Sequence, residues 1–172
     1  MKLLDKLGRS TRDVRTIKAL LTGAEAEAHL AGDPIPGAEH LLVSALALPD
    51  GSARRAFARV GADPDGLRPA IAAQHAEALR GVGIEPVGDD ALDAAGAEPT
   101  TQAAGAFRAT ASGRQAFQTA GDLARSAASP LVGAHVVVAV CRMEHGSAPR
   151  ALRSMGVDRD VLAAAALDEL GL

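Results

Sequence analysis

Aromatic side chains are nearly absent from this sequence of 172 residues, which contains three Phe, no Tyr and no Trp. Proteins that bind single-stranded nucleic acid stack the bases on aromatic rings, and the three Phe here are scattered. The charge is also balanced, because 18 Lys and Arg residues stand against 21 Asp and Glu residues without forming a basic stripe. Nucleic acid is therefore not an expected partner.

Disulfides and membrane spans are excluded in the same way. The single cysteine, Cys141, cannot form an internal disulfide. No apolar stretch approaches the roughly 20 residues that a membrane-spanning helix needs. The first eight residues carry charges within their apolar run, unlike the apolar region of a signal peptide. We therefore expect a cytoplasmic protein without a membrane partner.

Hydrophobic residues nevertheless make up 48% of the chain. With so few aromatics, a core must be built from Ala, Leu, Val and Ile, a composition typical of closely packed helices. It argues against a β-sandwich, and the length allows one compact domain or two small ones. An all-α fold is therefore expected.

An internal repeat organises the sequence. Residues 40–57 align with residues 135–152 at an offset of 95 residues. The match continues through four further pairs, which are Gly61 with Gly156, Asp63 with Asp158, Asp65 with Asp160 and Leu67 with Leu162. We predict two tandem copies of one four-helix unit, packed together.

The helices of each copy follow from apolar spacing and turn residues. In the first copy, helices are expected over 13–30, 40–48, from Ser52 to Gly61, and from Asp63 to about 79. In the second, they are expected over 110–127, 135–143, from Ser147 to Gly156, and from Asp158 to 170. Ser52 and Ser147 are the expected N-caps of the third helices, and Asp63 and Asp158 begin the fourth. The expected domains are residues 1–80 and 109–172, joined by an acidic linker rich in Gly and Pro over 81–108.

A known family matches the segment Gly37-Ala-Glu-His-Leu-Leu, followed by Gly51-Ser-Ala-Arg-Arg-Ala-Phe-Ala-Arg-Val-Gly-Ala-Asp. The pattern resembles the Clp N-terminal domain, a double helical repeat that precedes the ATPase rings of Clp-type unfoldases. The resemblance covers 13–79 closely and 110–170 more loosely. It implies a module that presents client proteins, adaptors or small cyclic peptides to an unfoldase, or that works apart from one.

No phosphate-binding loop of the type Gly-x-x-x-x-Gly-Lys-Ser/Thr is present, and the chain ends two residues after the last helix. We therefore expect a stand-alone member without ATPase modules and without a cofactor, acting as an adaptor, a decoy or a sensor. A second hypothesis is a sequestering protein that holds a cyclic-peptide antibiotic between the repeats. An enzyme is the weakest alternative, because no catalytic arrangement can be assembled from these residues.

Related domains of Gram-positive bacteria are receptors for phosphorylated arginine, and the resemblance implies where such a ligand would bind. A carboxylate takes the guanidinium and a hydroxyl near the start of the first helix holds the phosphate. In the first copy, Glu39 fits the carboxylate position, but the hydroxyl position falls on Val14, with Thr11 and Thr16 nearby.

In the second copy, the hydroxyl position falls on Thr110. The turn is one residue shorter there, so the carboxylate position falls on Ala134 or His135, and neither is an acid. Each copy is thus expected to keep a different half of the site. Phe107 is the one aromatic residue near the positions that cyclic peptides use in this family.

Several of these residues have simpler interpretations. Glu39 also suits the first turn of a helix, where the helix dipole favours a carboxylate. His40 and His135 stand at equivalent positions and are expected to bond to the preceding turns as structural histidines. No second His or Cys stands at chelating spacing, so no metal site is expected. Cys141 aligns with Leu46 and is expected to be a small core residue.

Overall fold

The computed structural model describes residues 2–81 and 108–172, with side chains from Asp13 onward in the first range. The first copy comprises α1 (Lys2–Leu30), α2 (Ala38–Leu46), α3 (Ser52–Arg59), the 3-10 turn η1 (Pro64–Gly66) and α4 (Leu67–Gly81). The second comprises α5 (Ala111–Ser126), α6 (Gly133–Cys141), α7 (Ser147–Ser154) and α8 (Arg159–Leu170). These two ranges contain no strand, and the predicted all-α double repeat is confirmed.

The helix positions of the two copies align at the predicted offset, with one gap. α6 and α7 begin and end 95 residues after α2 and α3. At the ends of the first helices the offset is 96 residues, because Gly32 (φ 76) and Ala128 (φ 50) hold equivalent left-handed positions. The missing residue of the second copy therefore lies in the turn after Ala128 and before α6.

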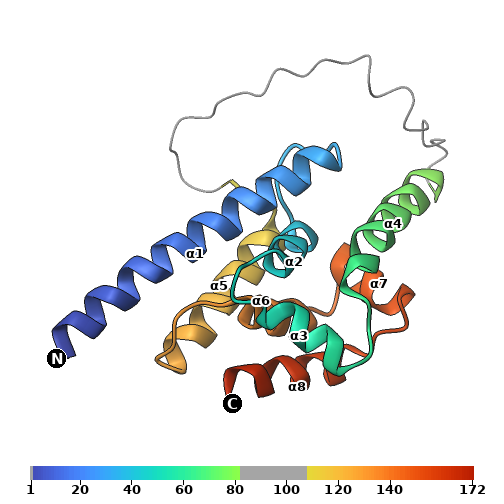
Figure 1. Cartoon of the computed structure of the whole chain (residues 1–172). Coiled ribbons are helices and arrows are strands. Elements are labelled where there is room, and N and C mark those ends of the chain that lie inside the picture. Colours follow the sequence, from blue (N-terminus) through green and yellow to red (C-terminus); the bar gives the residue numbers. More distant parts are fainter. Residues whose placement is uncertain (1, 82–107) are drawn as a thin grey trace.

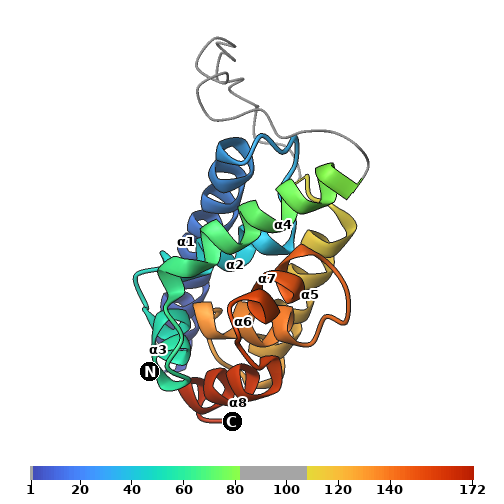
Figure 2. The same ribbon diagram turned by 90° about the vertical axis from the view of Figure 1, so that its right-hand side faces the viewer.

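α2 and α6 form the centre of the molecule (Figures 1 and 2). All nine residues of α6 are buried, and so is every residue of α2 except Glu39. α1 packs along α2, while α5 and α8 pack along α6. Other contacts cross between the copies, since α2 packs on α5 and α6, α3 packs on α8, and α4 packs on α7.

Small side chains allow this close packing in a chain with few aromatics. A Cβ on Gly133 would lie 2.9 Å from the carbonyl oxygen of Ala45 and 2.9 Å from the Cβ of Ala53. α6 can therefore approach α2 and α3 this closely only with glycine at its first position. Phe57 is fully buried and is the largest side chain of the described core.

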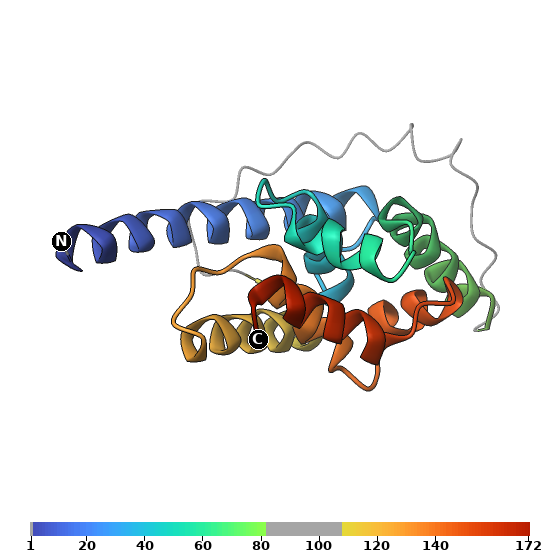
Figure 3. The same ribbon diagram turned by 60° about the horizontal axis from the view of Figure 1, so that its bottom comes forward.

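Some expected helix ends are wrong. α1 begins at Lys2 and not near residue 13, and its N-terminal turns extend past the other helices (Figure 3). The central helices begin and end two residues earlier than expected. Ser52 and Ser147 are the first residues of α3 and α7, while the N-cap positions belong to glycines without a capping side chain.

The predicted start of the fourth helix is confirmed in the second copy, whereas in the first copy Asp63 caps η1 and α4 begins at Leu67. The Asp63 carboxylate accepts a hydrogen bond from the amide of Asp65 at 3.0 Å, and Asp158 accepts from the amide of Asp160 at 2.9 Å. Pro64 occupies the start of η1, where its missing N–H costs nothing. No helix in the part of the chain that the structure describes is long and apolar enough to span a membrane.

One ion-pair cluster fastens α3 to α8 across the copies. The Arg55 and Arg59 Nε atoms each donate to a different carboxylate oxygen of Glu169 at 2.6 Å. These two hydrogen bonds lower the pKa of Glu169. The carboxylate therefore stays ionised to a lower pH than an isolated glutamate would.

Candidate ligand-binding site

Thr110 marks the start of α5 and rests on the turn before α2. Its hydroxyl accepts a hydrogen bond from the amide of Gly113 at 3.1 Å, which is an N-cap. Its own amide donates to the carbonyl of Pro36 at 3.0 Å. A Cβ on Gly113 would lie 2.8 Å from that same carbonyl oxygen, so glycine is needed for the close contact. The start of the second copy is thus fixed against the first copy.

Glu39 lies at the same turn. It is the second residue of α2, and its side chain is 12% exposed. The carboxylate folds back over Gly37, where an added Cβ would lie 2.6 to 2.8 Å from the carboxylate atoms. We name the residues Pro36, Gly37, Glu39 and Thr110 the α2–α5 corner.

The α2–α5 corner changes how the two half-sites are understood. The sequence placed Glu39 and Thr110 in different copies, each without its partner. In the structure both lie against the Pro36–Gly37 turn, because the start of α5 crosses to the first copy. A carboxylate of the first copy and the N-cap of the second therefore lie against the same turn.

The other expected positions carry no polar group that could hold such a ligand. Val14 lies within α1, well after the first residue of that helix, and is 62% exposed. Since the gap lies in the turn before α6, the carboxylate position of the second copy is Ala134, which is fully buried. Phe107 lies outside the described residues.

Both histidines have the expected structural role. The Nδ1 of His40 accepts from the amide of Gly37 at 3.0 Å, and the Nδ1 of His135 accepts from the amide of Val132 at 3.1 Å. Both rings are buried, and desolvation is the main cause that lowers each pKa. Neutral imidazoles therefore cap the two central helices in the same way.

This tautomer also limits what else the histidines can do. Because Nδ1 uses its lone pair on a backbone amide, the neutral ring carries its proton on Nε2. His135 Nε2 lies 3.3 Å from the Ser129 hydroxyl and donates to it, so His135 cannot act as a base toward Ser129. The contact is structural.

Asp33, Glu39 and His40 form the one group in residues 13–81 and 108–172 with the spacing of metal ligands. His40 Nε2 lies 3.3 Å from an Asp33 oxygen but has no well-aligned hydrogen bond. Its proton leaves no lone pair for a metal, whereas metal-bound histidines donate their other N–H outward. The cluster is therefore a poor metal site.

Cys141 is a core residue, as expected. It is buried in α6, and desolvation raises the pKa of its thiol to about 12. Nucleophilic cysteines have a lowered pKa and some exposure. The thiol is therefore unsuited to nucleophilic catalysis.

Two features of the site region have no local sequence pattern. Asp50 oxygens accept from the amide of Gly133 at 3.2 and 3.3 Å, and the Ser52 hydroxyl accepts from the amide of Ala134 at 2.8 Å. Nearby, the Leu131 amide donates to Asp13 at 3.1 Å. We name Asp50, Ser52, Gly133 and Ala134 the α6 joint. Side chains of the first copy therefore accept the hydrogen bonds of the first two amides of α6.

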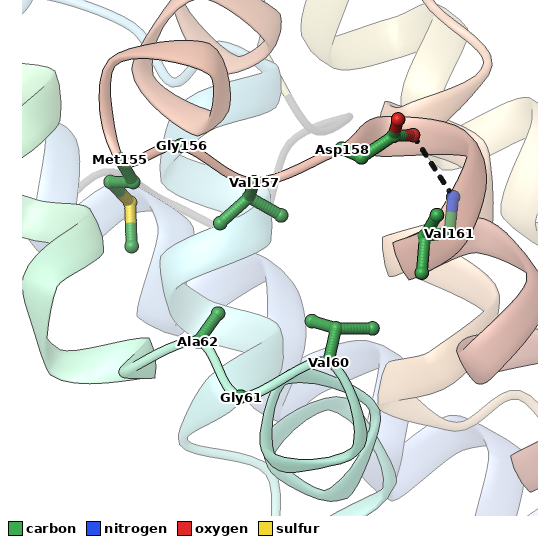
Figure 4. A pocket seen from close by; sticks show the side chains of 8 residues that line it. All are labelled: Val60, Gly61, Ala62, Met155, Gly156, Val157, Asp158 and Val161. Carbon is green, nitrogen blue, oxygen red and sulfur yellow. Dashed lines mark hydrogen bonds between the residues drawn. The ribbon is translucent and has the colours of Figure 1, made fainter.

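A hollow of about 210 Å³ opens between the equivalent turns that follow α3 and α7. Its lining comprises Val60, Gly61, Ala62, Met155, Gly156, Val157, Asp158 and Val161 (Figure 4). We name it the inter-copy hollow. Its surface is mixed, because apolar side chains stand beside polar groups that include the Asp158 carboxylate.

Comparison with known proteins agrees with this architecture. Residues 15–98 match the family described as Clp repeat (R) N-terminal domain. No curated protein matches the chain.

Two solved structures cover nearly the whole chain. The N-terminal domain of the caseinolytic protease associated chaperone ClpD from Arabidopsis thaliana is 23% identical, with a TM-score of 0.58 over 92% of this chain and 93% of that one. A structure from preliminary structural investigations of a malarial protein secretion system is 14% identical, with a TM-score of 0.57 over 92% of both chains. At these identities the likeness concerns the fold. Residues 15–98 thus match the sequence pattern of the Clp repeat N-terminal domain, and both copies share the fold of the ClpD N-terminal domain.

Proposed function

We propose that this chain is a non-catalytic recognition module of a Clp-type unfoldase or protease system, binding client proteins, adaptors or degradation signals. Its family supports interaction with proteins or peptides. The observation that carries the finer proposal is the meeting of Glu39 and Thr110 at the α2–α5 corner.

The α2–α5 corner suits a ligand that carries both a guanidinium and a phosphate. Glu39 is an acceptor for paired guanidinium hydrogen bonds. The Thr110 hydroxyl and the first amides of α5 favour an anion, and Arg114 adds a cation, since its guanidinium bonds to the carbonyl of Ala109 beside this helix start. Phosphoarginine in a peptide combines these two groups.

Calorimetry with one peptide in three forms tests this ligand. The forms carry phosphoarginine, arginine or phosphoserine at the same position. We expect tightest binding of the phosphoarginine form and a loss of about tenfold or more for Glu39→Gln, because a hydrogen bond to a charged group is removed. Thr110→Ser keeps the N-cap hydroxyl and should bind like the original.

Two results would overturn the proposed ligand. One is equal affinity for the arginine and phosphoarginine forms. The other is unchanged affinity in Glu39→Gln, whose fold is checked by circular dichroism.

The role in proteolysis is tested in a reconstituted unfoldase and protease with a phosphoarginine-bearing client. A decoy slows degradation, and excess free phosphoarginine relieves the inhibition. An adaptor speeds degradation at low concentration. No effect in either direction contradicts a role in delivering clients.

The alternative, sequestration of a cyclic-peptide antibiotic between the copies, has less support. The inter-copy hollow of about 210 Å³ is below the roughly 300–1,000 Å³ of small-molecule pockets. Calorimetry with such peptides would revive this alternative if binding were tight and client degradation were unaffected.

A further inference from the structure

The inter-copy hollow is built from two equivalent turns that face each other. Val60, Gly61 and Ala62 correspond to Met155, Gly156 and Val157 at the 95-residue offset. Both glycines adopt a left-handed conformation, with φ of 67 and 72. At each glycine the chain therefore turns sharply after its helix. The hollow lies between these two turns.

Apolar side chains from both turns point into this space. Val60 and Ala62 point toward Val157 and Val161 across the opening in Figure 4. Val161 is 53% exposed although it lies on the first turn of α8 beside this lining. A volume of about 210 Å³ leaves room for about one side chain, because whole small molecules need roughly 300 Å³ or more.

The surroundings of the inter-copy hollow are acidic. Asp158 lines it, Asp63 follows Ala62, and Asp160 lies between Asp158 and Val161 in sequence. All three are exposed, and none belongs to an ion pair within the residues that the structure describes.

The nearest cations in sequence are engaged elsewhere. Arg159 donates to the carbonyl of Met143 at the end of α6, and Arg59 is held by Glu169. Neither residue lines the inter-copy hollow. The carboxylates around an apolar opening are thus left without a partner charge.

We propose that the inter-copy hollow is a second binding subsite, which takes one apolar side chain of an extended peptide whose neighbouring residue is Lys or Arg. The apolar side chain fills the space among Val60, Ala62 and Val161, and the cation lies beside Asp158. The inference rests on the proposed function only in taking a peptide as the ligand. It uses neither Glu39 nor Thr110.

Nuclear magnetic resonance of the whole ¹⁵N-labelled chain tests the subsite. The probe is the capped peptide Gly-Gly-Leu-Arg-Gly-Gly, compared with forms in which Leu becomes Ala or Arg becomes Glu. We expect the Leu-Arg form to shift the amide signals of Gly61 and Gly156 in a saturable manner, and each altered form to bind more weakly.

Three variants make the test specific. Ala62→Leu fills the inter-copy hollow and should abolish the shifts. Asp158→Asn keeps the N-cap, since Asn caps as well as Asp, but removes the charge and should weaken binding about two- to fivefold at low salt. Asp122→Asn changes the charge equally on exposed α5 and should leave binding unchanged.

The proposal is overturned if the Leu-Arg peptide leaves both glycine signals in place at millimolar concentration. It is also overturned if the three peptides bind equally, or if a folded Ala62→Leu binds as the original does. Because the probe lacks phosphate, a failure here is separate from a failure at the α2–α5 corner, where Glu39→Gln is the diagnostic change.

Discussion

The starts of α2 and α6 are equivalent in sequence but differ in their contacts with the other copy. In both helices the third residue is a histidine whose Nδ1 accepts a hydrogen bond from the amide of the N-cap residue. At α6 the next amides donate to Asp50 and Ser52 of the other copy, and Ala134 stands where a carboxylate would be. At α2 the residues equivalent to Asp50 and Ser52 are His145 and Ser147, and Glu39 keeps its carboxylate beside the start of α5.

This difference indicates that equivalent helix starts in a duplicated fold can take different roles. One helix start became a joint that holds the copies together. The other carries Glu39, which we propose as part of a ligand site. The asymmetry explains why a single α2–α5 corner, and not one site in each copy, carries the proposed recognition.

The largest expected effect comes from crowding the α6 joint. Gly133→Ala places a methyl 2.9 Å from the Ala45 carbonyl oxygen and the Ala53 Cβ, which should cost about 2–3 kcal/mol of unfolding free energy. The control is Gly121→Ala, which meets nothing within 4 Å in α5 and should stabilise by about 0.5–1 kcal/mol. Urea unfolding followed by circular dichroism measures both. Equal effects would mean that α6 does not approach its neighbours this closely.

The next effect separates two equivalent serines. Ser52→Ala leaves the buried amide of Ala134 without its partner, and we expect a loss of about 1–2 kcal/mol. Ser147→Ala at the equivalent position removes a hydroxyl with no such role and should change stability by less than about 0.5 kcal/mol. The same unfolding measurement decides, and similar losses at both positions would contradict the division between joint and open start.

A smaller effect of about 1 kcal/mol is expected from Glu169→Gln, which breaks the contact of α8 with Arg55 and Arg59. Since the folded pKa of Glu169 is lowered, its stabilisation is present above the ordinary glutamate pKa of about 4.3 and is lost as pH falls through the lowered folded value. The two proteins should therefore converge in stability under acid. A difference that persists at pH 2 would show that the charge is not the cause.

The smallest effect sharpens the same comparison on the other side of the molecule. α4 packs on α7 as α8 packs on α3. At the 95-residue offset, Gln74 is equivalent to Glu169, and Arg150 is equivalent to Arg55. Gln74→Glu should supply the missing acceptor and stabilise by about 0.3–0.5 kcal/mol at low salt. In Gln74→Glu with Arg150→Gln the gain should vanish, and a gain that survives would place its origin elsewhere.

Local patterns in the sequence were enough to predict the order of the helices and the caps formed by histidine and aspartate, but not every helix end. The apolar central helices, the two histidines and the caps Asp63 and Asp158 all depend on residues within a few positions of one another. The α6 joint joins residues 82 and 83 positions apart, and the contacts of Glu169 span 110 and 114. The spacing of apolar residues along a helix cannot reveal contacts between residues so far apart in the sequence.

The candidate site shows the same limit. Sequence comparison predicted Glu39 and Thr110 as the retained polar positions, and assigned each to its own copy. Their convergence depends on the Thr110 amide reaching the Pro36 carbonyl, a contact between copies. The start of α1 was missed because the apolar spacing strengthens at Ile17, whereas the helix continues back to Lys2.

The α6 joint also has a consequence for how the chain folds. An isolated second copy would lack Asp50 and Ser52, so two amides at the start of its most buried helix would lose their acceptors. We therefore expect that the second copy is not a complete folding unit, and that folding requires closing a loop of about 80 residues before α6 is fully stabilised. A duplication that began as two copies of one unit has become a single cooperative molecule.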